Sequence, residues 1–127
     1  MYLDIDRIFE MLSCDNDLVI QQQGIELAKN IRHLSVLMRP VESKLIWENC
    51  AKVLASKCDN ELEFYIIYLF EWLKDMNWPG ADIIYRKLKS MPIHFIKQGY
   101  LICYKTAITT RDFVWQQVLE DFRQDLF

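Results

Sequence analysis

Glycine and proline are scarce in this sequence, which has only three of each among its 127 residues. An all-β domain needs turn residues about every ten positions, and this chain does not supply them. Hydrophobic residues make up 52% and charged residues 26% of the chain, which is typical of a globular protein and not of a disordered one. The scarcity of turn residues therefore predicts an all-α fold.

Long hydrophobic runs and clustered metal ligands are also missing. No apolar run approaches the roughly 18 residues that cross a bilayer, and the start MYLDIDRIFE carries charges from position 4 without the apolar segment of a signal peptide. The four cysteines are dispersed without a Cys-x-x-Cys pair, so we expect reduced thiols and no zinc site. These absences predict a cytoplasmic protein that does not contact a membrane.

Motifs for catalysis or cofactor binding are absent as well. The chain contains neither G-x-x-x-x-G-K-[ST] nor G-x-G-x-x-G, whose glycine-rich loops hold phosphates. No serine or cysteine lies in a recognised nucleophile motif, and His33 and His94 are isolated. We therefore expect no enzymatic activity, no catalytic residue and no cofactor.

Apolar residues recur at helical spacing along most of the chain. The pattern predicts about seven helices, over 5–12, 17–37, a segment opened by Pro40, 62–73, a segment opened by Pro79, 95–108 and 112–126. Residues 62–73, LEFYIIYLFEWL, are apolar on almost every side, which indicates a buried central helix. Short connections between the helices favour antiparallel neighbours.

A five-residue pattern occurs twice, 44 residues apart, as CDNDL at Cys14–Leu18 and as CDNEL at Cys58–Leu62. Each copy precedes a predicted helix that its acids would cap. A unit of this length with two helices is typical of HEAT repeats, although two ordinary caps could also coincide by chance. We therefore predict one domain, residues 1–127, folded as a short HEAT-like right-handed stack of antiparallel helix pairs.

The segment 69–84, LFEWLKDMNWPGADII, places Asn-Trp-Pro-Gly between two apolar runs. Asn77 would cap the helix that contains Pro79, and Gly80 would let a ring or a backbone approach closely. An exposed aromatic ligand pocket is the alternative, but aromatic residues at helical spacing are more often packed. We predict a structural corner between two packed helices, formed by Trp72, Asn77, Trp78, Pro79 and Gly80.

Charge is distributed unevenly along the chain, with six basic residues and no acidic one between positions 83 and 111. This basic strip is interpreted as a solvated surface, as a binding surface for an acidic protein, or as a nucleic-acid site. For the last of these the sequence pI of about 5.3 is low. The candidate partner-binding residues in the strip are Arg86, Lys87, Lys89, Lys97 and Lys105.

Acidic residues gather near the two copies of the five-residue pattern. The candidates are Asp15, Asp17, Asp59, Glu61 and Glu63. Because equivalent ends of stacked units lie side by side, they would form an acidic ridge that imitates phosphates and blocks a basic toxin such as a nuclease. The alternative is that these acids serve only the positive ends of the helix dipoles.

Three segments resemble one known family. EWLKDMNWPGADII, with IWENCAKVL upstream and RDFVWQQVL downstream, is similar to small bacterial all-helical proteins of unknown function that carry EWLxDxNWPxA and an Asp-aromatic-Trp sequence in the last helix. The resemblance extends from Asp15 to Phe122 and is specific only in its Asn-Trp-Pro core. It implies an all-α, HEAT-like fold, a role as the immunity partner of a toxin, and no catalytic residues.

These features together predict a non-catalytic module that binds a protein, for which a cognate bacterial toxin is a candidate. One alternative is a helical-repeat protein that binds nucleic acid with residues 83–111, or a repair-type enzyme of that shape. Another is a purely structural or oligomeric protein. The sequence identifies neither the partner nor the oligomeric state.

Overall fold

The computed structural model describes residues 4–126, with side chains described through Gln124, and this part is all-helical. The helices of six residues or more are α1 (Ile5–Leu12), α2 (Leu18–Ala28), α3 (Trp47–Ala55), α5 (Ile66–Glu71), α6 (Ala81–Ser90), α7 (Ile93–Thr109) and α8 (Phe113–Leu126). The shorter segments are α4 (Asp59–Leu62) and the 3-10 turns η1 (Leu34–Leu37), η2 (Lys44–Ile46), η3 (Glu63–Tyr65) and η4 (Trp72–Lys74). The predicted all-α fold of about seven helices is therefore confirmed.

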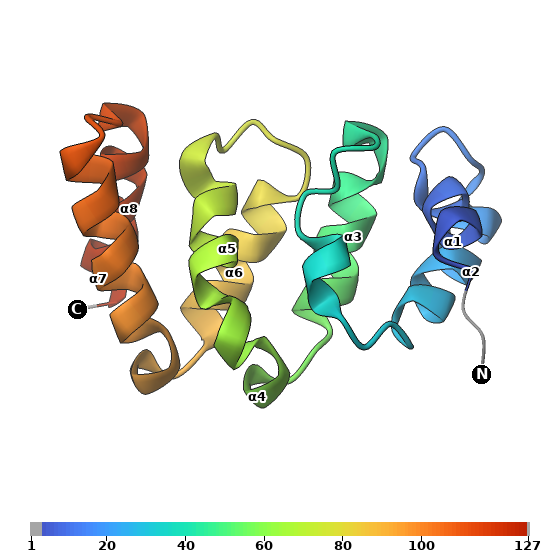
Figure 1. Cartoon of the computed structure of the whole chain (residues 1–127), viewed down its shortest axis with the longest axis horizontal. Coiled ribbons are helices and arrows are strands. Elements are labelled where there is room, and N and C mark those ends of the chain that lie inside the picture. The colour runs from blue at the N-terminus through green and yellow to red at the C-terminus, as the bar shows by residue number, and fades with distance from the viewer. Residues whose placement is uncertain (1–3, 127) are drawn as a thin grey trace.

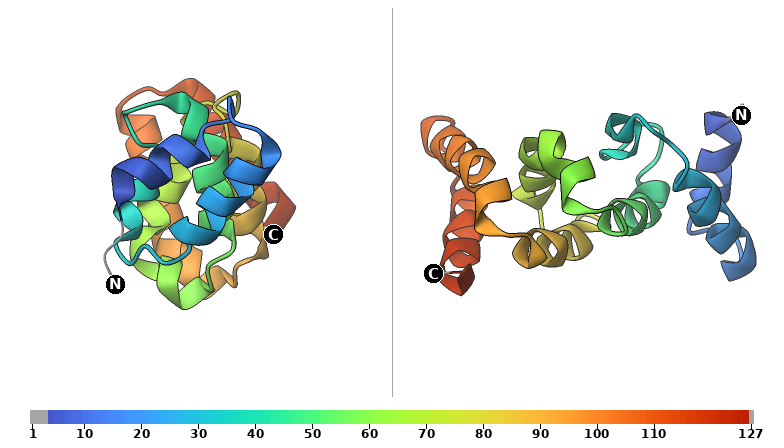
Figure 2. Two further views of the ribbon diagram at one scale, coloured as in Figure 1. Left: turned by 90° about the vertical axis from the view of Figure 1, so that its right-hand side faces the viewer. Right: turned by 90° about the horizontal axis from the view of Figure 1, so that it is seen from below.

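The helices form an elongated stack of antiparallel pairs (Figure 1). From the N-terminal to the C-terminal end the pairs are α1–α2, η1–α3, α5–α6 and α7–α8. Figure 2 shows η1, α5 and α7 in one layer and α3, α6 and α8 in the other. The hairpins α1–α2 and α7–α8 therefore form the two ends of the stack. Within the described residues, no helix combines the length and the apolarity that crossing a membrane requires.

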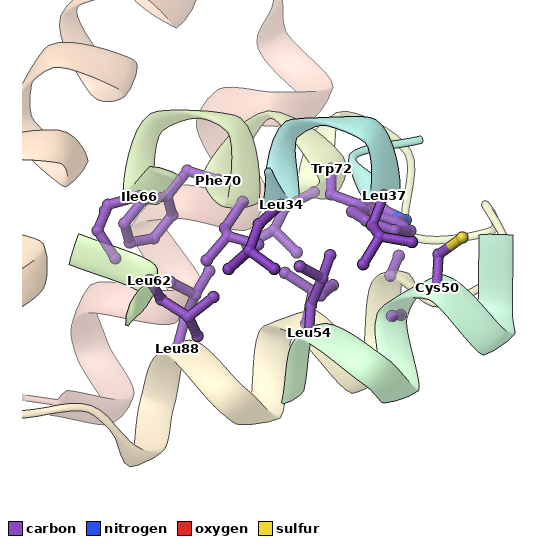
Figure 3. Packing of buried hydrophobic residues seen from close by; sticks show 14 of the residues in the cluster. Leu34, Leu37, Cys50, Leu54, Leu62, Ile66, Phe70, Trp72 and Leu88 are labelled. Atoms are coloured by element: carbon purple, nitrogen blue, oxygen red, sulfur yellow. The ribbon is translucent and has the colours of Figure 1, made fainter. Parts of the chain in front are cut away.

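Buried apolar side chains fill the space between the two layers (Figure 3). Leu34 of η1 and Phe70 of α5 face Leu54 of α3 and Leu88 of α6 across this space. All four side chains are 3% exposed or less. Each pair thus buries its apolar side against its neighbours, as in other proteins built from stacked helix pairs.

Helix α7 approaches α5 closely at Gly99. A Cβ atom at this position would lie only 2.6 Å from Cγ2 of Ile66. One turn further along α7, Sγ of Cys103 donates a hydrogen bond to the carbonyl O of Ile67 at 3.8 Å. The missing side chain at position 99 therefore lets α5 and α7 lie side by side.

The helix predicted over 17–37 is wrong in its second half, because α2 ends at Ala28. The amide of Ile31 donates to the carbonyl O of Ala28 at 3.0 Å, and the side chain of Asn30 donates to carbonyls in the last turn of α2. Such local side-chain bonds compete with continuation of a helix. Residues 34–37 then form the separate turn η1.

Pro40 does not open a helix as predicted, and the helix predicted after Pro79 begins at Ala81, so that Pro79 itself lies outside it. Helix α3 begins at Trp47, after Pro40. The two proline carbonyls instead accept hydrogen bonds from indole N–H groups, at 2.6 Å from Trp47 and at 3.0 Å from Trp72. Each proline therefore fixes the position of a tryptophan ring.

The segment 62–73 is not one helix buried on every side. It is divided among α4, η3, α5 and η4. Phe64 is 84% exposed, Tyr68 is 50% exposed and Ile67 is 39% exposed. The stack has two layers, and no further layer covers the outer side of α5 in the part of the chain that the structure describes. Folding alone therefore does not explain the apolar residues on that side.

The two copies of the five-residue pattern occupy different places in the stack. In the first copy Asp17 is the N-cap of α2, and its Oδ1 accepts a hydrogen bond from the amide of Ile20 at 3.0 Å. In the second copy Cys58 is the N-cap of α4, and Glu61 Oε1 accepts from the Cys58 amide. The first copy joins two helices of one pair, whereas the second joins two pairs. The predicted 44-residue repeat unit is therefore wrong.

Candidate protein-binding surfaces

Three indole rings meet at the corner between η4 and α6. Trp47 of α3 packs edge-on against Trp72 and Trp78, with ring centroids 6.2 Å and 5.6 Å away. Trp72 is fully buried and Trp47 is 7% exposed, while Trp78 is half-buried against them. The corner is therefore an extension of the core, with Trp47 at its centre. The sequence did not indicate this role of Trp47.

Gly80 provides the space for this packing. Its φ of +86° lies in the left-handed region, which favours glycine. A Cβ at position 80 would lie 2.7 Å from Cβ of Ala51 and 3.2 Å from Cζ2 of Trp72. The predicted cap at Asn77 is wrong: its amide donates to Asp75 Oδ1 at 2.8 Å, and the N-cap residue of α6 is Gly80 itself.

The acidic candidates do not form the predicted ridge. Asp15 and Asp17 belong to the loop between α1 and α2, at the upper edge of the stack in Figure 1. Asp59, Glu61 and Glu63 belong to α4 and η3, at the lower edge. The ridge prediction is wrong because the two pattern copies are not equivalent in the stack.

Two of the lower-edge acids interact within the chain. Asp59 Oδ1 lies 3.7 Å from Lys87 Nζ, and Glu61 Oε2 lies 3.8 Å from Lys57 Nζ. Hydrogen bonds from the side chain and amide of Cys58 lower the pKa of Glu61. These acids therefore stabilise the start of α4 and its contact with α6.

The basic strip separates into two parts with different surroundings. In the α6 part, Arg86 Nη2 lies 2.6 Å from Asp82 Oδ2, and Lys87 is paired with Asp59. Lys89 Nζ lies over an aromatic ring of the same helix at 4.8 Å. The positive charge of this part is therefore largely engaged inside the molecule.

The α7 part of the strip presents positive charge that no described residue pairs with. Lys97 and Lys105 are exposed and have no ion pair or hydrogen bond to another described residue. Helix α7 itself contains no aspartate or glutamate. Of the predicted basic candidates, these two remain available for a partner.

Apolar and basic residues alternate along the exposed side of α7. Ile93, Lys97, Leu101 and Lys105 are spaced four positions apart and Ile108 follows, so they lie along one side of the helix. Ile93, Leu101 and Ile108 are 40%, 51% and 47% exposed. We call these five residues the α7 row.

The α7 row borders α8 on one side, where Ile93, Lys97 and Leu101 line a hollow with Phe122 and Arg123. Ile102, which is 44% exposed, lies beside the row, and α5 is the next helix in the same layer (Figure 2). The α5–α7 face is defined as the α7 row together with Ile102, Phe64, Ile67 and Tyr68. Its apolar members were not predicted as surface residues, because their helical spacing indicated burial.

A second apolar surface lies at the other end of the stack, on the outer side of α2. Leu18, Val19 and Leu27 are 80%, 67% and 42% exposed, and they line an open depression of about 700 Å³. Glu26, which lines the same depression, pairs with Lys29 at 3.0 Å. Unlike the α5–α7 face, this surface therefore carries no unbalanced charge.

The buried titratable groups are not arranged as a reactive centre. Burial raises the pKa values of the Cys50 and Cys103 thiols to about 12, so both stay protonated at neutral pH and are poor nucleophiles. Burial also raises the pKa of Tyr100 to about 12, and its hydroxyl donates to the Leu119 carbonyl O at 2.6 Å. In the described part of the chain, no three His, Cys, Asp or Glu side chains gather as a metal site would require.

The fold and its surfaces define an all-helical protein of stacked helix pairs with an exposed apolar face. The chain belongs to a family known as a domain of unknown function, DUF5071, whose model matches residues 47–126. The match begins at Trp47, later than the Asp15 expected from the resemblance, and it covers α3 to α8 with all three rings of the corner. The comparisons found no similar protein of curated function and no similar solved structure.

Proposed function

We propose that this protein is a non-catalytic module that binds another protein through the α5–α7 face. The observation that carries the proposal is the exposure, on α7 and on the neighbouring segment η3–α5, of Phe64, Ile67, Tyr68, Ile93, Leu101, Ile102 and Ile108. Apolar area left in water forgoes about 25 cal/mol per Å² of burial energy, and the core of the stack is complete without these side chains. Exposed apolar residues gathered on neighbouring elements are typical of interaction sites.

The proposal includes a HEAT-like relationship, for which the paired helices in two layers are the support. In such stacks each pair contacts only its neighbours, and the outer sides of the helices form an extended surface for partners. The α5–α7 face has this position, because it lies on the outer side of one layer and continues to the C-terminal end of the stack.

The proposed partner is a bacterial toxin that the protein neutralises in the cytoplasm. Support for this part comes from the resemblance centred on Asn77-Trp78-Pro79, and not from the chemistry of the surface. Co-expression with a toxin encoded by a neighbouring gene should restore growth to a host that the toxin alone arrests. Neighbouring genes that encode only unrelated housekeeping enzymes would argue against a toxin partner, without affecting the binding surface.

Capture from a lysate of the native host tests the binding function. The wild-type protein should retain one specific protein, and the double variant Leu101→Ser/Ile102→Ser should lose it. Val19→Ser is the matched control, because Val19 is also apolar and exposed but lies at the other end of the stack. Circular dichroism melting curves should agree for all three proteins. Equal retention by all three, or loss with Val19→Ser alone, would contradict the proposed surface.

Nucleic-acid binding receives less support from the charges. Arg86 and Lys87 are paired with acids, so few of the basic candidates remain for phosphates. Binding to the nucleic-acid backbone depends on many simultaneous phosphate contacts and weakens steeply with salt. We expect no retarded band in a gel-shift experiment with DNA or RNA, even at low salt.

A further inference from the structure

We infer that the element recognised by the α5–α7 face is an amphipathic helix with acidic residues along one flank of its apolar side. This inference rests on the proposed function and specifies the chemistry of the partner. The inference is argued from the shape of the surface, the position of its two lysines and the pairing of the neighbouring acids.

The shape of the surface fits a helix. The α7 row extends along a 17-residue helix, which corresponds to about 25 Å at 1.5 Å per residue. On one side of the row, its residues Ile93, Lys97 and Leu101 line a hollow together with Phe122 and Arg123 of α8. An exposed apolar line along a helix, bordered by such a hollow, is what a partner helix covers with residues spaced i, i+3, i+4 and i+7.

The two lysines define the charge of the partner. Lys97 lies four residues before Leu101 and Lys105 lies four residues after it, so the two lysines are about 12 Å apart along the helix axis. Neither is paired with a described residue, and α7 contributes no acid. A partner helix with two acids seven or eight positions apart would pair with both lysines while its apolar residues cover Leu101. Such pairs mainly fix partner choice and orientation.

The acidic residues on the α5 side of the surface do not require basic residues on the partner. Glu71 lies 3.8 Å from Lys74 and 4.0 Å from Arg39, so its charge is already balanced. Glu63 is exposed, and it would repel acids on the flank above α5. The acids of the partner are therefore expected opposite Lys97 and Lys105 and not above α5.

An anionic membrane is a weaker match for the same surface. Segments that bind acidic lipids carry clusters of about four to eight basic residues. The α7 row has two, Lys97 and Lys105, and Glu63 adds a negative charge nearby. The observations therefore favour a protein helix.

Two synthetic peptides test the inference directly. The acidic peptide is an 18-residue helix with leucines spaced i, i+4 and i+7 and glutamates along one flank, and the basic peptide has lysines in place of the glutamates. Fluorescence anisotropy of the labelled peptides measures binding to the full protein. The acidic peptide should bind about tenfold more tightly than the basic one. The double variant Lys97→Glu/Lys105→Glu should reverse this preference.

Three further measurements separate the possible outcomes. Leu101→Ser/Ile102→Ser should weaken both peptides, and Val19→Ser should change neither. The inference would be overturned by equal affinity for both peptides, or by a preference that survives Lys97→Glu/Lys105→Glu. The proposed function would still stand in that case if Leu101→Ser/Ile102→Ser loses the partner captured from the lysate. Preferential binding to phosphatidylserine vesicles over phosphatidylcholine vesicles, without a peptide preference, would also overturn it and assign the surface to a membrane.

Discussion

At the scale of single residues, Gly80 is the position where the tryptophan corner leaves no space for a side chain. Gly80→Ala would place a Cβ within 2.7 Å of Ala51 and retain an unfavourable φ of +86°. We expect a loss of about 2–4 kcal/mol in the free energy of unfolding, measured by urea denaturation. Asn77→Ala, at an exposed residue of the same loop, should cost less than about 0.5 kcal/mol. Equal stability of the two variants would contradict the corner geometry.

The four cysteines should separate into two reactivity classes. Cys14 and Cys58 are exposed, whereas Cys50 and Cys103 are 1% exposed or less and have pKa values near 12. A thiol reagent such as Ellman's reagent should modify two thiols in the native protein at pH 8, and all four in denaturant. Rapid native reaction of a third thiol would show that the core opens more readily than this packing implies.

The sequence identified some residues of the corner but not their arrangement. Trp72 and Gly80 stood out because tryptophan and glycine are unusual in a short segment between apolar runs. Trp47 did not stand out, because it is only one apolar position in a helical stripe and lies far from residues 72–80 in the sequence. Its contacts with Trp72 and Trp78 are tertiary, and local spacing carries no information about them.

At the scale of helices, the start of α2 depends on Asp17 and not on the neighbouring Asp15. Asp17 Oδ1 accepts a hydrogen bond from the amide of Ile20, whereas the Asp15 side chain accepts none from another described residue. Asp17→Ala should lower the free energy of unfolding by about 1 kcal/mol, and Asp15→Ala should change it by less than about 0.5 kcal/mol. Chemical denaturation at pH 7 distinguishes them, and the reverse order would contradict the observed cap.

Helix prediction succeeded where the periodicity is long and failed where local bonds or outer surfaces intervene. The helices predicted over 95–108 and 112–126 agree closely with α7 and α8. The prediction over 17–37 failed because Asn30 bonds to the end of α2. For 62–73, the apolar pattern could not distinguish a second buried side from an exposed one, since both require the same residue types.

At the scale of the whole molecule, the N-terminal hairpin is attached to the stack by polar contacts near both ends of α3. Asn49 Nδ2 donates to the Leu12 carbonyl O at 2.7 Å, and Lys57 Nζ donates to the Lys29 carbonyl O at 2.6 Å. Both acceptors lie at the C-terminal ends of helices, where carbonyls lack partners within the helix. The hairpin also contributes apolar side chains to the core, such as the fully buried Leu12.

Asn49→Ala should therefore loosen this end of the stack and leave the other end intact. The variant leaves a buried carbonyl at Leu12 unpaired, which costs about 1–3 kcal/mol, and stacked pairs depend mainly on their neighbours. Hydrogen–deuterium exchange should accelerate in α1 and α2 but not in α7 and α8. Asn60→Ala, at an exposed asparagine, serves as the control. Uniform acceleration along the chain would instead indicate a single cooperative unit.

The candidate surface was only partly predictable, because it depends on how the helices are stacked. The charge pattern alone pointed to Lys97 and Lys105, but it also pointed to Arg86 and Lys87, which the fold pairs with acids. The apolar members became recognisable only once α5 and α7 were seen side by side, an approach that depends on Gly99. Tertiary packing therefore decides which charged and apolar residues remain for a partner.

The most direct measurement is site-specific photo-crosslinking in the native host. A photoreactive p-benzoylphenylalanine would replace Leu101 in one variant and Val19 in another, since both are exposed apolar positions at opposite ends of the stack. The account predicts one defined protein adduct from position 101 and none from position 19. Adducts from position 19 with none from position 101 would contradict it.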